Sequence, residues 1–218
     1  MKYNRVIEGK FIDRPNRFIA HVEINGKRET VHVKNTGRCK ELLIPGVKVI
    51  LEMADNPSRK TKYDLIAVYK EDFGLINIDS QAPNKVAYEW LLKQDYAYIK
   101  PEYTYGSSRF DFYMEKGNEK YLLEIKGCTL ERNGIGFFPD APTTRGSKHL
   151  KELVEATKEG YHSMLGFVIQ MDGVDMVYPN VETDPDFAQS FDDAKNAGVK
   201  VLYLKCHIEE DGFEIIDK

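Results

Sequence analysis

The chain has 218 residues and a hydrophobic fraction of 42%, which suffices for a core and excludes an intrinsically disordered protein. No apolar run approaches the roughly 18 residues of a membrane-spanning helix, and the charged amino-terminal residues do not resemble a signal peptide. Three widely spaced cysteines favour a reduced, cytoplasmic protein over a disulfide framework.

The net charge of −4 is unevenly spread along the chain. Residues 1–62 carry +7, whereas residues 171–218 carry −8. A basic front part is typical of local polyanion binding, but unevenly distributed solvated charge would give the same pattern.

The first part of the chain alternates apolar and polar residues in the manner of β-strands. Asn25-Gly26 supplies the positive φ angles of a two-residue hairpin turn, which predicts that Phe18, Ala20 and Val22 share a buried face with Val31 and Val33. The expected strands are Val6–Ile12, Arg17–Ile24, Lys27–Val33, Val47–Met53 and Tyr63–Tyr69, with a short helix over Thr36–Leu43. Five strands in this order predict a small OB-like β-barrel spanning residues 1–72.

OB-like barrels often bind single strands through a basic, aromatic face. Tyr3 and Phe11 are candidate stacking groups, and Arg38 follows Gly37 in a tight turn that would present it to a phosphate. The cationic candidates are Arg14, Arg17, Arg28, Lys34, Arg38 and Lys40. For any one of them an ordinary exposed cation is the simpler interpretation, least so for Arg38.

Residues 73–218 follow a different pattern, in which two strands carry paired charges. A turn on Gly117-Asn118 places Asp111 opposite Glu124. The same register places Arg109 opposite Lys126, which shares the face of Glu124.

Two opposed carboxylates repel each other unless a cation lies between them. A hard divalent cation, Mg²⁺ or Mn²⁺, would fit Asp111 and Glu124, and Lys126 would orient a water or stabilise charge on a phosphate. A surface hairpin with ordinary cross-strand salt bridges is the alternative.

The order of the expected elements helps to decide between a metal site and a surface hairpin. A helix over 83–94, three strands, a Gly/Pro-rich loop, a further helix and the strand Met164–Met171 match the core of the PD-(D/E)XK nuclease fold, an α/β domain with a mixed sheet. Glu89 on the first helix would add a metal ligand, or would simply lie on a solvated helix face.

Four stretches carry a resemblance to a known family: NTGRCKELLIPG (35–46), SSRFDFYM (107–114), YLLEIKGCTL (121–130) and FPDAPTTRGSKHLKEL (138–153). With them the chain resembles the sugar fermentation stimulation protein A family over nearly its whole length. The resemblance implies an OB-like domain, a restriction-endonuclease-like domain, DNA binding and a DNA/RNA nuclease role with Asp111, Glu124 and Lys126 as site residues. Phe110 stands where the nuclease motif usually has Pro.

Residues 138–150 run from a loop into the start of a helix, where backbone N–H groups favour the binding of phosphate. Arg145, Lys148 and His149 are therefore candidate nucleic-acid contacts. Alternatively, Ser147 or Thr143 caps the helix and His149 packs locally.

We therefore expect a Mg²⁺-dependent enzyme that cleaves phosphodiester bonds in nucleic acid. The first rival is a non-catalytic DNA-binding regulator of sugar-metabolism genes of the maltose type, as the family name suggests. The second is an interaction module whose acidic end recruits a partner.

Overall fold

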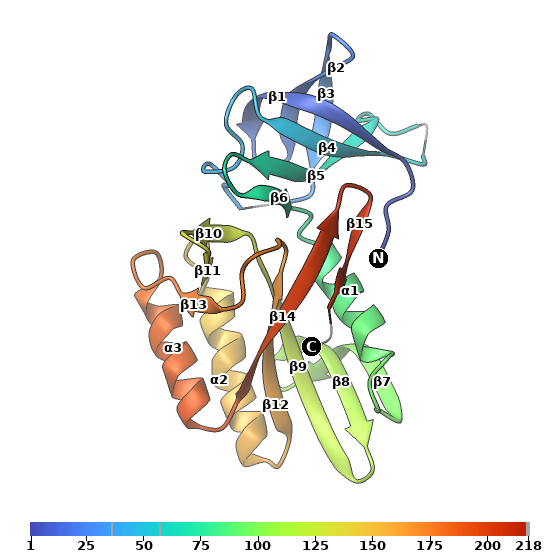
Figure 1. Cartoon of the computed structure of the whole chain (residues 1–218). Coiled ribbons are helices and arrows are strands. Elements are labelled where there is room, and N and C mark those ends of the chain that lie inside the picture. The colour runs from blue at the N-terminus through green and yellow to red at the C-terminus, as the bar shows by residue number, and fades with distance from the viewer. Residues whose placement is uncertain (36, 57, 217–218) are drawn as a thin grey trace.

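The computed structural model describes residues 1–35, 37–56 and 58–216. Its amino-terminal part is a barrel in which strand order is β3-β2-β1-β4-β5-β6, closed by a parallel pairing of β3 with β5. The strands are β1 (Val6–Asn16), β2 (Ile19–Ile24), β3 (Lys27–Val33), β4 (Lys48–Met53), β5 (Tyr63–Lys70) and β6 (Gly74–Asn77). Strands β1 to β5 confirm the predicted OB-like barrel, with β6 added at its edge (Figure 1).

The β2–β3 hairpin has the predicted register. Ala20 pairs with Val31, and the turn residue Asn25 has a φ of 51°. Phe18 departs from the prediction, because it lies just before β2 with half of its side chain exposed.

No helix forms among residues 37–43, where a short one was expected; Thr36 lies outside the described residues. Arg14 accounts for the difference, because its guanidinium donates to the carbonyls of Asn35, Gly37 and Arg38 at 2.6–2.9 Å. These carbonyls are then unavailable for helical hydrogen bonds, and the segment folds as turns.

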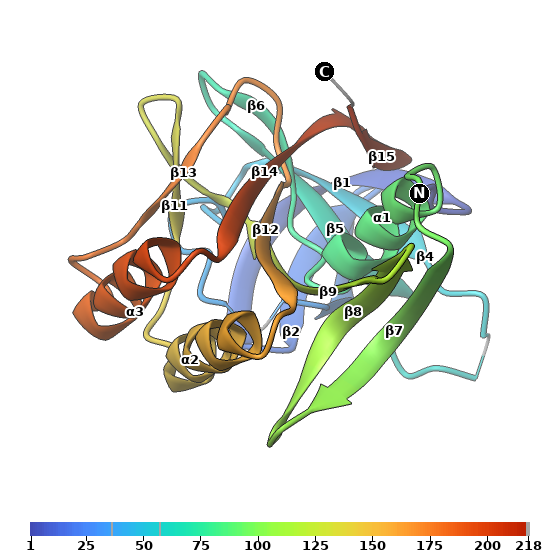
Figure 2. The same ribbon diagram turned by 90° about the horizontal axis from the view of Figure 1, so that it is seen from below.

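The carboxy-terminal part is a mixed sheet of order β15-β14-β12-β9-β8-β7, with β9, β12 and β14 parallel, as predicted. Helices α2 and α3 cover one face and α1 covers the other (Figure 2). The elements are α1 (Ala82–Leu91), β7 (Tyr98–Tyr105), β8 (Ser108–Lys116), β9 (Glu119–Cys128), β10 (Leu130–Arg132), β11 (Ile135–Phe138), α2 (Thr144–Lys158), β12 (His162–Ile169), β13 (Val177–Pro179), α3 (Pro185–Asn196), β14 (Lys200–Glu209) and β15 (Gly212–Ile215).

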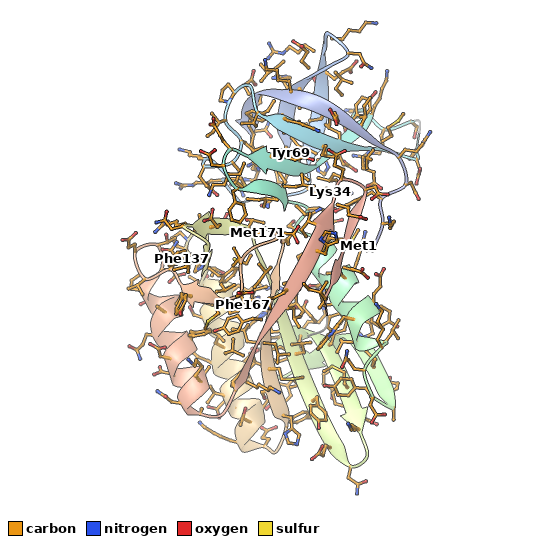
Figure 3. The ribbon with its side chains drawn as sticks, viewed as in Figure 1. Met1, Lys34, Tyr69, Phe137, Phe167 and Met171 are labelled. Carbon is orange, nitrogen blue, oxygen red and sulfur yellow. The ribbon has the colours of Figure 1, made fainter. Side chains whose placement is uncertain are left out.

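The two parts meet over a polar junction. Glu210, in the turn of the β14–β15 hairpin, accepts from Lys48 at 3.0 Å and from Tyr69 at 2.7 Å on the barrel. Lys34 lies at the same junction, with Nζ 3.3 Å from Glu52, 3.4 Å from Asp64 and 3.6 Å from Asp79 (Figure 3). The Lys48–Glu210 ion pair therefore joins the barrel to the carboxy-terminal sheet.

The segment that joins the two parts begins with β6, which hydrogen-bonds to β5 of the barrel. The boundary near residue 72 stays a prediction. None of the described helices is long and apolar enough to cross a membrane.

Candidate active site

Asp111 lies where β8 leaves its partner strand β9. The two strands pair from Lys116 with Glu119 to Phe112 with Leu123, which confirms the predicted register. The ladder ends there, and the Asp111 carboxylate instead accepts from the backbone N–H of Ile125 at 2.7 Å.

The same irregularity changes which side of the sheet the β8 side chains face. Phe110 packs in the core on the α2 side, whereas Phe112 and Met114 pack on the α1 side. Arg109, expected opposite Lys126, is exposed and forms an ion pair with Glu102 at 2.5 Å.

Glu124 on β9 is 3% exposed, and both of its oxygens are inside the protein. Oε1 accepts from Lys126 Nζ at 2.5 Å and from His149 Nδ1. Burial acts to raise the pKa of Glu124, but the His149 hydrogen bond and the Lys126 charge outweigh it and hold that pKa below its usual range. Glu124 is therefore ionised, as a carboxylate that binds a metal ion must be.

Oε2 of Glu124 has no hydrogen-bond partner among the described residues. A buried, unpaired carboxylate oxygen costs free energy, and such atoms call for a specific explanation. Asp111 supplies a second carboxylate nearby, and burial together with the Glu124 charge raises its pKa to about 6.

These features fit a hard divalent cation. Mg²⁺ commonly takes one or two protein carboxylates and leaves its other positions to water and phosphate. Asp111 and Glu124 would hold the ion, and the described residues contain no group of three or more His, Cys, Asp or Glu side chains arranged for a metal. The remaining ligands would have to come from the solvent, the backbone or a substrate.

Helix α1 contributes Asn84 to this site, where Glu89 was the sequence candidate. Asn84 Nδ2 donates to Asp111 Oδ1 at 2.6 Å. Glu89, five residues later and thus turned by about 140° around the helix, instead pairs with the amino group of Met1 at 2.7 Å. An amide at the start of a helix gives no sequence signal of this role.

The three residues of helix α2 that were predicted to contact nucleic acid lie in different environments. Thr143 caps the helix by accepting from Gly146 N at 3.0 Å. His149 is buried against Glu124, so it is not free to contact a phosphate, and its Nε2 accepts from Arg145 Nε at 3.3 Å. Arg145 and Lys148 are exposed, although Lys148 also donates to the Ser107 carbonyl.

The barrel cations also divide into two groups. Arg17, Arg38 and Lys40 line a groove of about 630 Å³ between the barrel and the loop that precedes α2. The groove also contains Arg14, but its guanidinium binds loop carbonyls and so acts as a structural group. Lys34 is likewise committed to internal ion pairs, and Arg28 pairs with Asp13.

The prediction that Tyr3 and Phe11 stack on bases is corrected by the structure. Tyr3 and Phe11 are buried at 6% and 3% exposure, so neither can stack freely on a base. Phe18 does have an exposed ring, and the Arg17 guanidinium lies 5.9 Å from its centroid.

Two family profiles match the chain. The sugar fermentation stimulation protein RE domain matches residues 81–212, and the SfsA N-terminal OB domain matches residues 12–78. The chain belongs to the sugar fermentation stimulation protein A family. This confirms the resemblance seen in the sequence.

Relatives in this family span the whole chain. The sugar fermentation stimulation protein homologues of Clostridium beijerinckii and Desulfitobacterium hafniense are each 54% identical over 100% of this chain, covering 97% and 96% of their own lengths. The SfsA structure from Pyrococcus furiosus, described as a complex with Ca²⁺, aligns with a TM-score of 0.86 at 28% identity, over 98% of this chain and 94% of that one. The family name states no enzymatic activity.

Replacing Asp111 by Asn should stabilise the protein in EDTA by about 0.5–2 kcal/mol, because it removes one of two buried, repelling carboxylates. Mg²⁺ should stabilise the wild type by about 2.7 kcal/mol at a hundredfold excess over its Kd, and the variant much less. Thermal melts with EDTA and with a Mg²⁺ titration measure both effects. Lower stability in EDTA together with a wild-type response to Mg²⁺ would mean that the carboxylates do not share an ion.

Proposed function

We propose that the protein is a divalent-metal-dependent nuclease that hydrolyses phosphodiester bonds in DNA or RNA. The observation that carries the proposal is the buried, unpartnered Oε2 of Glu124, beside Asp111 and within the same cluster as Lys126. The Ca²⁺ complex of the Pyrococcus furiosus relative supports divalent-ion binding in this family, and we infer Mg²⁺ or Mn²⁺ as the working metal here.

A bound divalent ion would neutralise charge on the phosphate and activate a water for attack. The rest of the work falls to the side chains of this chain. Lys126, only 16% exposed, is held beside Glu124 and stabilises negative charge as it builds on the phosphate. Asn84 and the Ile125 N–H hold Asp111 in one orientation.

Substrate positioning falls to two exposed regions. Arg145 is anchored through Nε on His149, which leaves its terminal nitrogens to contact a phosphate. The groove cations Arg17, Arg38 and Lys40 bind the backbone further along the strand. The cytoplasm, where nucleic acid and Mg²⁺ are both present, is the proposed location.

The direct test is incubation of the purified protein with labelled single- and double-stranded DNA and RNA in Mg²⁺, Mn²⁺ or EDTA. We expect cleavage with either metal and none with EDTA. Tight binding to duplex DNA without cleavage of any substrate would instead favour the rival, a non-catalytic DNA-binding regulator.

Arg38→Ala should weaken binding of single strands irrespective of sequence and reduce the log–log salt slope by about 0.7, the contribution of one phosphate contact. Fluorescence anisotropy over a range of NaCl concentrations in EDTA measures the slope. Arg5→Ala is the matched control, because Arg5 is an exposed barrel cation paired with Asp55 at 3.7 Å and does not line the groove. An unchanged slope in Arg38→Ala would assign Arg38 to ordinary surface.

A further inference from the structure

A small pocket of about 160 Å³ lies between the barrel and the carboxy-terminal domain, and two of its lining residues are next in the chain to residues of the candidate active site. Pro83 lines it and precedes Asn84, which binds Asp111. Gly127 also lines it and follows Lys126 on β9. Two residues of the lining are therefore direct chain neighbours of Asn84, which orients Asp111, and of Lys126.

The pocket adjoins the basic groove of the barrel. Gly37 lines both cavities, and the consecutive residues Asp140 and Ala141 line the pocket and the groove respectively. Gly37 has no room for a side chain, since a Cβ would come within 2.2 Å of Asp140 Oδ2. The groove and the pocket therefore adjoin each other at Gly37.

The pocket combines a few apolar side chains with a larger polar lining. Pro83, Leu130, Phe137 and Phe138 supply the apolar part, and Asn35, Ser80, Thr129, Asp140 and Gln170 supply the polar part. Gln170, 1% exposed, is fixed because its Nε2 donates to the Asn77 carbonyl at 3.1 Å and the Asp79 carbonyl at 3.2 Å.

The Gln170 carbonyl is the part of this amide left for a ligand. No described residue donates a hydrogen bond to Oε1, which lies so close to Gly127 that a Cβ there would be 2.3 Å away. Aromatic rings beside fixed hydrogen-bonding groups are typical of sites that hold an unstacked base. The available atom is an acceptor, so it suits a base that carries an amino group.

We propose that this pocket holds one unpaired nucleobase during the reaction, so that the substrate is a single strand or an unpaired end. The inference rests on the proposed nuclease function, whose substrate class it defines. The volume lies below the roughly 300–1,000 Å³ of pockets for drug-sized ligands, so it accommodates one base and excludes a base pair. Adenine, cytosine and guanine offer an amino donor to Gln170, whereas thymine and uracil do not.

The experiment uses the full chain and a single-stranded oligonucleotide that contains 2-aminopurine, a fluorescent amino-bearing base. In EDTA, binding should change the 2-aminopurine signal, and oligo(dC) should reverse the change at a concentration at least tenfold lower than oligo(dT). In Mg²⁺, a single strand should be cleaved at least tenfold faster than the blunt duplex of the same sequence. DNA and RNA versions of each substrate are compared.

Thr129→Phe fills the pocket, and Thr104→Phe on the exposed face of β7 is the matched control. Thr129→Phe should lose the 2-aminopurine response and at least tenfold of the cleavage rate, while anisotropy shows that the groove still binds the strand. Thr104→Phe should behave as the wild type. If Thr129→Phe does not fold, as its circular dichroism would show, the wild-type measurements still decide the question.

The base-binding pocket and the nuclease activity can be refuted independently of each other. Equal cleavage of duplex and single strand, or a full 2-aminopurine response in folded Thr129→Phe, would overturn the pocket and leave the nuclease intact. A 2-aminopurine response that Thr129→Phe abolishes, with no cleavage of any substrate, would overturn the nuclease and leave the pocket as a binding site.

Discussion

Glu124→Gln is expected to reduce cleavage at least about 100-fold, while binding of nucleic acid in EDTA remains within about twofold of the wild type. The amide removes the negative charge that a divalent ion needs. It also brings an N–H donor toward Lys126 and His149, which both donate to this side chain in the native protein. Initial rates with a labelled single strand in Mg²⁺, and anisotropy in EDTA, measure the two properties.

Glu119→Gln is the matched control for this variant. Glu119 stands on the same strand, β9, but its carboxylate is exposed and accepts from Tyr121 away from the active site. The control should cleave at the wild-type rate. Wild-type cleavage by Glu124→Gln would refute the assignment of the metal site.

Lys34→Met should destabilise the protein by about 3–5 kcal/mol, because removing one partner from a buried ion pair leaves uncompensated charge. Lys34 is 14% exposed, and the acids around it, Asp64 and Asp79, are 4% and 0% exposed. Without the ammonium group Asp79 and Glu52 lose their ion-pair partner, whereas Asp64 keeps Arg59 at 2.7 Å. Urea denaturation, followed by circular dichroism at neutral pH, gives the free energy of unfolding.

Lys158→Met is the control for charge removal at an exposed position. Lys158 pairs with Glu155 three residues earlier on α2, and both side chains are more than 60% exposed. Such a pair contributes about 0.5 kcal/mol or less. A loss below about 1 kcal/mol in Lys34→Met would show that the junction does not depend on this cation.

Local chemistry made part of this structure predictable from the sequence. Asn25-Gly26 and Gly117-Asn118 each fix a two-residue turn, and a turn of known length sets the pairing of every residue in the strands beside it. The proximity of Asp111 to Glu124 follows from that register. The motif in the YLLEIK stretch then supplies Lys126 on the same face of β9.

The parts that were not predictable depend on contacts between distant segments. The turns after residue 36 form because Arg14, on another strand, binds their carbonyls. His149 has the spacing of an exposed helix residue near a phosphate, but the fold buries it on Glu124. The sequence points to Glu89 because a carboxylate is a recognisable ligand, whereas the amide of Asn84 matters only through its position on α1.

The first and last segments of the chain also form a strand pair. Tyr3 N donates to the Asp211 carbonyl at 2.7 Å, Phe213 N donates to the Met1 carbonyl at 3.1 Å, and Lys2 bridges to Gly212. A ribosome that adds about 5–20 residues per second takes on the order of ten to forty seconds to make the intervening chain. The nascent barrel therefore emerges and folds well before the β14–β15 hairpin that anchors it exists. Until the β14–β15 hairpin is made, the barrel lacks the contacts of Glu210 with Lys48 and Tyr69, so under the proposed function a growing chain would hold a strand less firmly against Asp111 and Glu124.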